Sequence, residues 1–168
     1  DGIDHINIYS KGKTELGKLL TNFAHTPFDC DYGHFESIEG FWYWLKTLLL
    51  DTNWNKEQKV KIELLRGAYG YEAKRLGREL LSKNIDGSDK INIDESFKLD
   101  ILKAVRCKLN HNKHIKMMLA RSNLPFTHYY FYGKEENPKI YELPEYHWQI
   151  EYFEKVRTYL KDQNCQKL

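Results

Sequence analysis

The sequence predicts an α+β protein that is mostly helical and has a few short strands. Apolar residues recur at helical spacing in six segments after residue 36, whereas strand-forming runs are short and lie within residues 5–10, 28–35 and 126–132. A length of 168 residues suits one domain with a sizeable core, and 41% hydrophobic residues exclude a disordered chain. No repeat or long linker divides the chain, so we expect a single domain over residues 5–160 with tails at 1–4 and 161–168.

Composition excludes several classes of function. The net charge of +2 is too small to indicate nucleic-acid binding by itself, although basic residues cluster near 74–78 and 103–108. Three cysteines without Cys-x-x-Cys spacing indicate a reducing compartment rather than a zinc site or a disulfide scaffold. His111 and His114 lie in a polar connection without nearby acids, which argues against a metal site there. No apolar run approaches the ~20 residues that span a membrane. We therefore expect a cytoplasmic protein without membrane attachment, metal ion or cofactor.

The first half of the chain is predicted to form two strand regions and one aromatic helix. His5–Ser10 alternates polar and apolar residues, as a half-buried strand does, and a polar loop then leads into a short helical turn. Strand-forming runs flank Asp31-Tyr32-Gly33 and predict a hairpin. Ser37 or Glu36 is expected to cap the aromatic helix, which we end near Asp51.

The second half is predicted to be mainly helical. The expected helices cover residues 56–66, 72–82, 94–110, 113–121 and 145–160, with a surface loop over 83–90, a strand over 126–132 and a charged loop over 134–139. Asp94 is expected to cap the helix that follows it. Gly77 lies inside a predicted helix, where glycine costs about 1 kcal/mol relative to alanine, and this indicates close backbone packing or a ligand.

The aromatic helix has two interpretations. In the first, one face of the helix binds a small polar ligand with a ring, and an acid and an amine lie roughly 10 Å apart along the axis. The residues that share this face are Glu39, Trp42, Tyr43 and Lys46. In the second, Trp42 and Tyr43 only complete a wide apolar helix. The core is then lined by Phe41, Trp44, Leu45 and Leu48.

Six short motifs occur in order along residues 5–133. They are Ile8-Tyr9-Ser10, Thr21-Asn22-Phe23, Ser37-Ile38-Glu39 followed by Phe41 and Lys46, Ala73-Lys74-Arg75-Leu76-Gly77-Arg78, Ala104-Val105-Arg106-Cys107-Lys108-Leu109, and Leu119-Ala120. In this order the motifs resemble those of the NADAR superfamily. The resemblance implies a YbiA-like domain and favours a functional role for the aromatic helix.

The sequence departs from the family pattern in three places. Family members usually end the late strand in Trp-Gly, often with an acid just before it, whereas this chain has Tyr132-Gly133 and no acid between Phe126 and Phe131. His128 is the candidate replacement for the absent acid. The Gly40 position is commonly polar in the family. The loop that follows Tyr132-Gly133 also differs, so we expect a different substrate loop.

Members of the family resemble N-glycosidases, which cleave the bond between a base-like nitrogen and C1 of ribose. The substrate classes are phosphorylated riboflavin-pathway intermediates and ADP-ribose attached to guanine. The resemblance thus implies a hydrolase that acts on an ADP-ribosyl or ribosyl-phosphate compound, either a nucleotide-like small molecule or ADP-ribosylated nucleic acid. Divergent members occur in phage genomes, and for a viral protein the expected location is the host cytoplasm.

The implied reaction passes through an oxocarbenium-like ribose, which needs a carboxylate and a proton donor for the departing base. Glu39 is the candidate carboxylate; desolvation by aromatic neighbours would raise its pKa and allow general-acid catalysis. The alternative is an ordinary surface glutamate at a helix start. A desolvated Lys46 can attack an opened ribose as a Schiff base, or it faces solvent, or it pairs with Glu39 or a phosphate.

Ten further residues are predicted to bind the ligand. They are Tyr9, Asn22, Phe23, Phe41, Trp42, Tyr43, Arg75, Arg78, His128 and Tyr132. The amide suits ribose hydroxyls or a base edge, the arginines suit a phosphate, and the rings suit a stacked base. Each type also has a structural alternative: a turn residue, a solvated helix face, or the core.

Two other classes of function remain open. One is a module that binds and sequesters ADP-ribose-like nucleotides without turnover, which the altered late strand favours. The other is a protein-interaction domain in which side chains fill the pocket.

Overall fold

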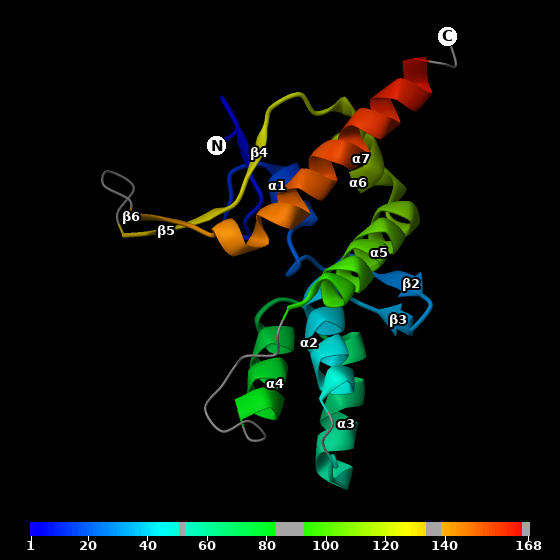
Figure 1. The fold of residues 1–168 in the computed structure, drawn as a ribbon. Coiled ribbons are helices and arrows are strands. Elements are labelled where there is room, and N and C mark those ends of the chain that lie inside the picture. Colours follow the sequence, from blue (N-terminus) through cyan, green and yellow to red (C-terminus); the bar gives the residue numbers. More distant parts are fainter. Residues whose placement is uncertain (51–52, 83–92, 134–138, 166–168) are drawn as a thin grey trace. The chain divides into compact units, whose positions relative to one another are not determined.

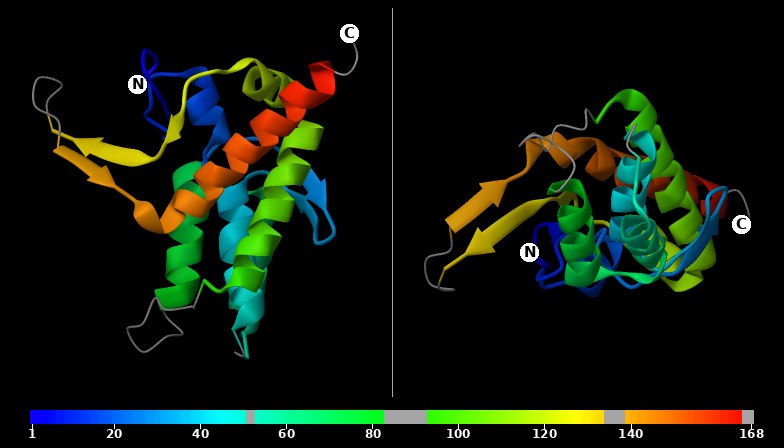
Figure 2. Two further views of the ribbon diagram at one scale, coloured as in Figure 1. Left: turned by 45° about the horizontal axis from the view of Figure 1, so that its top comes forward. Right: turned by 90° about the horizontal axis from the view of Figure 1, so that it is seen from below.

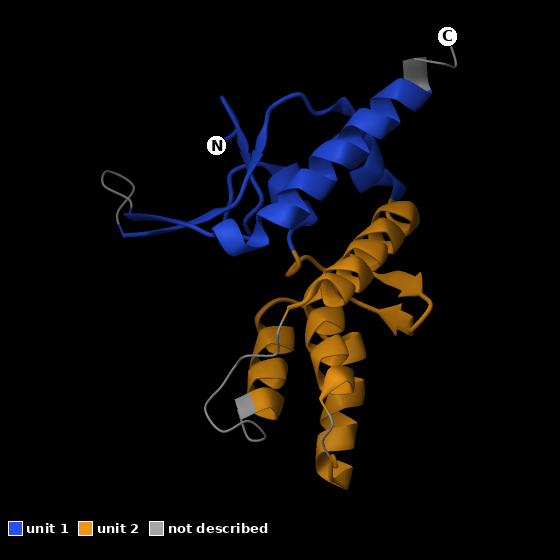
Figure 3. Ribbon diagram, viewed as in Figure 1, with its two compact units in different colours: residues 1–21, 113–168 blue, residues 22–112 orange. Residues whose placement is uncertain are grey.

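The computed structural model describes residues 1–50, 53–82, 93–133 and 139–165. These residues form seven α-helices and six short strands, and the strands pair into three two-stranded sheets (Figure 1 and Figure 2). The predicted α+β class, mostly helical with a few short strands, is confirmed. The chain separates into two compact units, unit 1 with residues 1–21 and 113–168 and unit 2 with residues 22–112 (Figure 3). The loops predicted over 83–90 and 134–139 lie outside the described residues, apart from position 139.

Unit 1 combines the two ends of the chain. Its elements are β1 (Ile6–Asn7), α1 (Glu15–Leu20), α6 (Lys113–Arg121), β4 (Phe126–Thr127), β5 (Tyr129–Tyr132), β6 (Lys139–Glu142), the short 3-10 helix η2 (Pro144–Tyr146) and α7 (His147–Cys165). β1 pairs in parallel with β4, and β5 pairs antiparallel with β6. α6 packs against both α1 and α7, and the buried residues include Leu16, Leu20, Ile115, Leu119, Phe126 and Phe153.

The first strand is shorter than the prediction over residues 5–10. The chain turns directly after β1, because Tyr9 N donates to Asn7 O at 2.9 Å and Gly12 N donates to Tyr9 O at 2.8 Å. The strand itself therefore contains only Ile6 and Asn7, as partners of Phe126 and Thr127, and Ile8 N adds one further hydrogen bond to Thr127 O at 2.8 Å.

The late strand changes its partner at His128, so the single strand predicted over 126–132 is divided into β4 and β5. Asn7 lies fully buried beside the division. Its side-chain nitrogen donates to Tyr129 O at 3.0 Å, and its side-chain oxygen accepts from Tyr129 N at 3.1 Å. One amide thus replaces two hydrogen bonds of a strand ladder. β6 was not predicted, because its four residues are all exposed and their strand conformation depends on pairing with β5.

Unit 2 is built around α2. Its elements are β2 (Phe28–Cys30), β3 (Gly33–Phe35), α2 (Ile38–Leu49), α3 (Lys56–Leu64), the 3-10 helix η1 (Leu65–Gly67), α4 (Gly70–Ser82) and α5 (Glu95–His111). α2 lies between α4 and α5 in Figure 1 and Figure 2 and packs against both. The predicted hairpin is present, and β2 packs against α5.

The helix caps of unit 2 agree with the local sequence signals. The Ser37 side chain accepts a hydrogen bond from Gly40 N at 3.0 Å, and that of Asp94 accepts one from Phe97 N at 2.8 Å. α5 buries the stripe expected from its spacing, and this stripe includes Lys108, which is only 1% exposed. Burial lowers the pKa of Lys108 to about 7. No residue of α3 is buried, so the α3 segment contributes little to the core.

Gly77 allows α4 to approach the aromatic helix closely. A Cβ atom at this position would lie 2.0 Å from Cγ of Tyr43 and 2.2 Å from its Cδ1. Because Cγ is bonded directly to the Tyr43 Cβ, rotation of the ring about its own axis cannot relieve the clash. Close packing therefore explains the glycine that the sequence flagged.

Gly77→Ala is expected to lower the free energy of unfolding by about 1–3 kcal/mol, because overpacking outweighs the gain in helix propensity. Urea unfolding at constant pH measures the change. In the control Gly67→Ala the added Cβ meets nothing within 4 Å, so that variant should stay within about 0.5 kcal/mol of the wild type. A Gly77→Ala protein with unchanged stability would contradict the close approach of α2 and α4.

Candidate active site

Glu39 lies in the first turn of α2, where two backbone segments hold it. Its backbone N–H donates to Asn22 O at 2.8 Å. One residue further, a Cβ at Gly40 would lie 2.3 Å from Leu65 O and 2.9 Å from Ala68 O. Ser37 Oγ also donates to Ala68 O at 2.8 Å. Glycine at position 40 is therefore required by close contact with the backbone.

The carboxyl group of Glu39 has a strongly perturbed proton affinity. Burial raises its pKa from 4.5 to about 7, and the positive charges of Lys74, Lys46 and Arg78 oppose this rise. Within the described part of the chain, no group hydrogen-bonds the carboxylate. Part of the side chain remains exposed to solvent. The arrangement produces a reachable carboxyl group that exchanges its proton near neutral pH.

Lys46 lies two turns along the same helix face, as its spacing predicts. Its Nζ atom lies 5.8 Å from the centroid of the Trp42 ring and 5.9 Å from that of the Tyr43 ring. At these distances the ring faces attract an ammonium group. Trp42 itself is buried, and its ring meets the edge of Phe97 at a centroid distance of 4.9 Å. The face with Glu39 therefore contains a cation held over two aromatic rings.

Phe41 and its neighbours line the core, as the second interpretation of the helix expected. Phe41 is 1% exposed, and its ring lies 5.0 Å from that of Phe35 and 6.3 Å from that of Trp44. This burial leaves Phe41 no surface on which a base could stack. Leu48 is 56% exposed, so its expected place in the core was wrong. The helix thus has both a core face and the Glu39 face.

The segment of Asn22 and Phe23 lies beside Glu39 and the start of α4. Phe23 O accepts a hydrogen bond from Gly70 N at 3.1 Å, and its ring meets the edge of Tyr71 at 5.3 Å. Lys74 Nζ lies 5.5 Å from the centroid of the Phe23 ring. Sequence analysis singled out neither Lys74 nor Tyr71 as a site residue, although Lys74 belongs to a quoted motif. Its position four residues before Arg78 was the available signal.

The two predicted phosphate-binding arginines of α4 differ in their surroundings. Arg78 acts electrostatically on Glu39. Arg75 is 65% exposed and lies 3.6 Å from Glu79, so it belongs to a solvated ion pair. The structure therefore brings Arg78, but not Arg75, into the electrostatic environment of Glu39.

Three of the predicted ligand-binding residues, Tyr9, His128 and Tyr132, belong to unit 1. Tyr9 packs against the rings of Tyr130 at 5.0 Å and Phe131 at 5.5 Å. His128 Nδ1 donates to Ile8 O at 2.7 Å, and burial lowers the pKa of the imidazole. Tyr132 is exposed at the end of β5.

Comparisons with protein-family models, with curated proteins and with solved structures return no match. The resemblance to the NADAR superfamily therefore stays a prediction. Among the described residues, no three His, Cys, Asp or Glu side chains are arranged to hold a metal ion. None of the helices in these ranges combines the length and the apolar character needed to cross a bilayer.

Replacing Glu39 by glutamine should stabilise the protein at high pH. Between pH 4.5 and about 7 the folded state keeps a proton that the unfolded state has released, so the free energy of unfolding falls as pH rises. The rise of the pKa from 4.5 to about 7 corresponds to about 3 kcal/mol, which partial exposure reduces. We expect Glu39→Gln to be about 1–3 kcal/mol more stable than wild type at pH 8 and equally stable at pH 4. Urea unfolding at both pH values measures this, and the exposed Glu72→Gln is the control.

Lys74→Gln should raise the pKa of Glu39 further, because Lys74 is the strongest of the three cations that lower it. Titration of the Glu39 carboxyl carbon by NMR measures the change directly. Lys59→Gln, an exposed change on α3, should leave the titration unaltered. A Glu39 pKa that is unchanged or lower in Lys74→Gln would show that the two charges do not interact.

Proposed function

We propose that unit 2 contains the reaction centre of an N-glycosidase-like hydrolase that cleaves a base–ribose bond in an ADP-ribosyl or ribosyl-phosphate compound. The observation that supports this most directly is the raised pKa of Glu39. Burial of its carboxyl group, which has no hydrogen-bond partner among the described residues, raises this pKa to about 7. A group with a pKa near the working pH is well suited to proton transfer in both directions.

Glu39 can serve both halves of the hydrolysis. A water oxygen bonds to C1 of the ribose while the bond between C1 and the base nitrogen breaks. The electron pair of the broken bond leaves with the base. As a carboxylate, Glu39 stabilises the oxocarbenium-like ribose and accepts a proton from the water. In its protonated form it returns that proton to the departing nitrogen. The reaction therefore adds one water molecule and leaves the enzyme unchanged.

The surroundings of Glu39 support a phosphorylated substrate with an aromatic base. Lys46, Lys74 and Arg78 create a positive field that attracts phosphate oxygens. The edge-to-face pair of Phe23 and Tyr71 provides aromatic surface, and Tyr71 is exposed. Because Lys46 is held as a cation over two rings, its geometry favours ion pairing over Schiff-base formation. The family resemblance adds the substrate class, ADP-ribose attached to guanine being one example.

A second candidate is a module that binds an ADP-ribose-like nucleotide without cleaving it. His128, which takes the place of the family acid, is held by Ile8 O, and its burial favours the neutral imidazole. An imidazole in this state does not supply the negative charge of the absent carboxylate. Recovery of an intact ligand after tight binding would favour this candidate over the hydrolase.

Glu39→Gln is expected to lower kcat on ADP-ribosylated guanosine by about 10²- to 10⁴-fold, because the amide keeps the shape of the side chain but neither accepts nor donates the transferred proton. Chromatographic release of guanine or guanosine measures turnover. Glu72→Gln, on the exposed start of α4, should retain wild-type turnover.

The hydrolase proposal fails if wild type and Glu39→Gln release product at equal rates. It also fails if the wild type cleaves no member of a panel of ribosyl–nitrogen compounds. Isothermal titration with ADP-ribose then separates the binding module from a pure protein-interaction domain, since the latter binds no nucleotide.

A further inference from the structure

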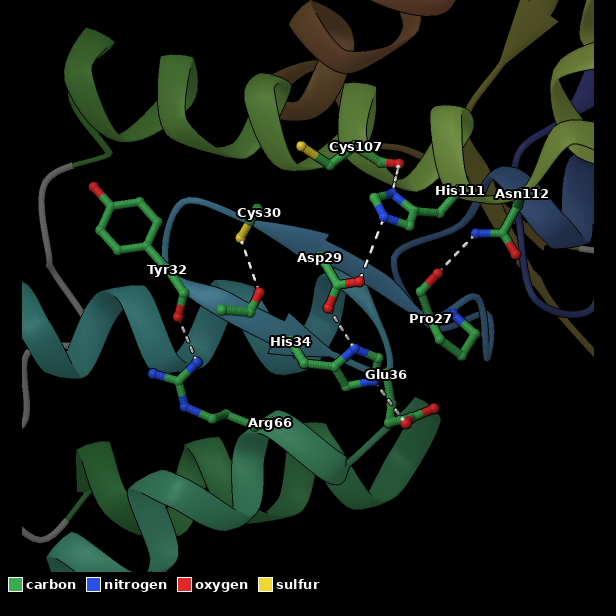
Figure 4. A network of polar contacts seen from close by, with 11 residues as sticks. Pro27, Asp29, Cys30, Tyr32, His34, Glu36, Arg66, Cys107, His111 and Asn112 are labelled. Carbon is green, nitrogen blue, oxygen red and sulfur yellow. Dashed lines mark hydrogen bonds and ion pairs between the residues drawn. The ribbon is translucent and has the colours of Figure 1, made fainter.

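Five side chains form a continuous chain of polar contacts along the β2–β3 hairpin, and they alternate between imidazole and carboxylate. His111 Nε2 lies 3.4 Å from Asp29 Oδ2, and His34 Nδ1 lies 2.9 Å from Asp29 Oδ1. His34 Nε2 lies 3.1 Å from Glu36 Oε1, and His25 Nε2 lies 2.5 Å from Glu36 Oε2. Figure 4 shows the part of this chain from His111 to Glu36. All five residues belong to unit 2.

The contacts of the central imidazole of this chain favour its charged form. Both nitrogens of His34 face carboxylate oxygens, and a carboxylate ion only accepts hydrogen bonds. Keeping both contacts as hydrogen bonds requires a proton on each nitrogen. The same contacts raise the pKa of His34, with Asp29 the larger cause and Glu36 the smaller. They also lower the pKa of Glu36, through His34 first and His25 second.

Glu36 connects this chain to the segment beside the candidate site. Its backbone O accepts from Thr26 N at 3.1 Å, and its backbone N donates to Arg66 O at 2.8 Å. The His25 ring, held by the Glu36 side chain, stacks on Tyr69 with centroids 4.4 Å apart. Three residues before His25, the Asn22 carbonyl accepts the backbone N–H of the candidate catalytic residue.

The opposite end of the chain is fixed at the last turn of α5. His111 Nδ1 donates to Cys107 O at 3.0 Å. The next residue, Asn112, donates from its side chain to Pro27 O at 2.9 Å. The hairpin is thereby tied to α5 near Pro27, while Glu36 contacts His25 and Thr26 a few residues earlier in the chain.

Two cations near the hairpin, Arg66 and Lys103, have other partners. Arg66, the cation that η1 presents to β3, donates to Tyr32 O at 2.6 Å and to Glu63 at 2.9 Å. Its guanidinium also lies over the rings of Phe35 and Trp44. From α5, Lys103 pairs with Asp100 at 3.0 Å near the hairpin turn. His34 is therefore balanced by its two carboxylates rather than by these groups.

We propose that this chain of alternating histidines and carboxylates is a proton-dependent clamp in which Glu36 acts as a positioning residue and holds residues 22–26 against the start of α2. The functional part of this inference rests on the proposed reaction at Glu39, whereas the structural part does not. When His34 loses its second proton, a neutral ring has a single N–H and releases either Asp29 or Glu36.

The clamp should be complete only in a window of pH. The raised pKa of His34 stabilises the folded arrangement below its unfolded value of 6.5, and this contribution is lost as pH rises through the folded pKa. The lowered pKa of Glu36 contributes stability to the folded arrangement above its unfolded value of 4.5. This contribution is lost as pH falls through the folded pKa of Glu36. Both contributions are therefore present between pH 4.5 and 6.5.

Amide hydrogen exchange of the intact chain tests the clamp, with protection factors taken for the N–H groups of Thr26 and Glu39. In the wild type we expect protection to fall by about tenfold between pH 6 and pH 9, because one charged hydrogen bond is lost. His34→Gln should show lower protection at pH 6 and a smaller fall by pH 9 than the wild type, the remaining fall being due to ionisation of Glu39. His34 is 53% exposed, so this variant should fold, and circular dichroism verifies that it does. His114→Gln on α6 is the control and should behave like the wild type.

Equal protection at both pH values in the wild type would overturn the clamp, as would an unchanged pH dependence in His34→Gln. If hydrolysis is found, the pH profile of kcat/KM separates positioning from mere stability: His34→Gln should lose the decline that the wild type shows as pH rises through the raised pKa of His34. Failure to hydrolyse any substrate defeats the proposed function and leaves the exchange result as the test of the clamp.

Discussion

The close contact between the start of α2 and the backbone after α3 determines the arrangement of unit 2. Gly40 leaves no room for a side chain against the carbonyls of Leu65 and Ala68, and Ser37 fixes this approach by hydrogen-bonding both Gly40 and Ala68. Once the first turn is held there, the direction of every later side chain on α2 follows from helix geometry. The core aromatics face inward, and Glu39 faces α4 with its cations.

Two glutamates near this helix start show how strongly position decides chemistry. Glu36 precedes the cap, meets two imidazoles directly and has a lowered pKa. Glu39 lies three residues later, where burial outweighs the more distant cations and raises the pKa to about 7. A direct charged hydrogen bond stabilises the carboxylate more effectively than a field does. Glu36 therefore stays ionised to lower pH than an ordinary glutamate and organises structure, whereas Glu39 is suited to exchange protons near neutral pH.

Features of the fold that depend on neighbours along the chain were predicted from the sequence. Features that depend on which segments pair in space were missed. Caps and helical periodicity involve neighbours along the chain, which is why Ser37, Asp94 and the face shared by Glu39 and Lys46 were predicted. The division of the late strand and the hairpin strand β6 depend on which segments pair, and spacing does not contain that information. Lys74 was missed for a related reason: the face of α4 that meets α2 is decided by the contact of Gly77 with Tyr43. The resemblance to a known superfamily rests on short sequence motifs. The hydrolase proposal made from that resemblance is supported by the geometry around Glu39 in unit 2.

The buried amide of Asn7 has a consequence for how this protein tolerates change. It both donates to and accepts from the backbone of Tyr129, so the position requires a residue with two opposite polar functions on one short stem. Aspartate has the right shape but offers only acceptors, and leucine has the right volume but offers neither function. Asparagine is therefore hard to replace at this position, because few other side chains can both donate to and accept from the same backbone residue.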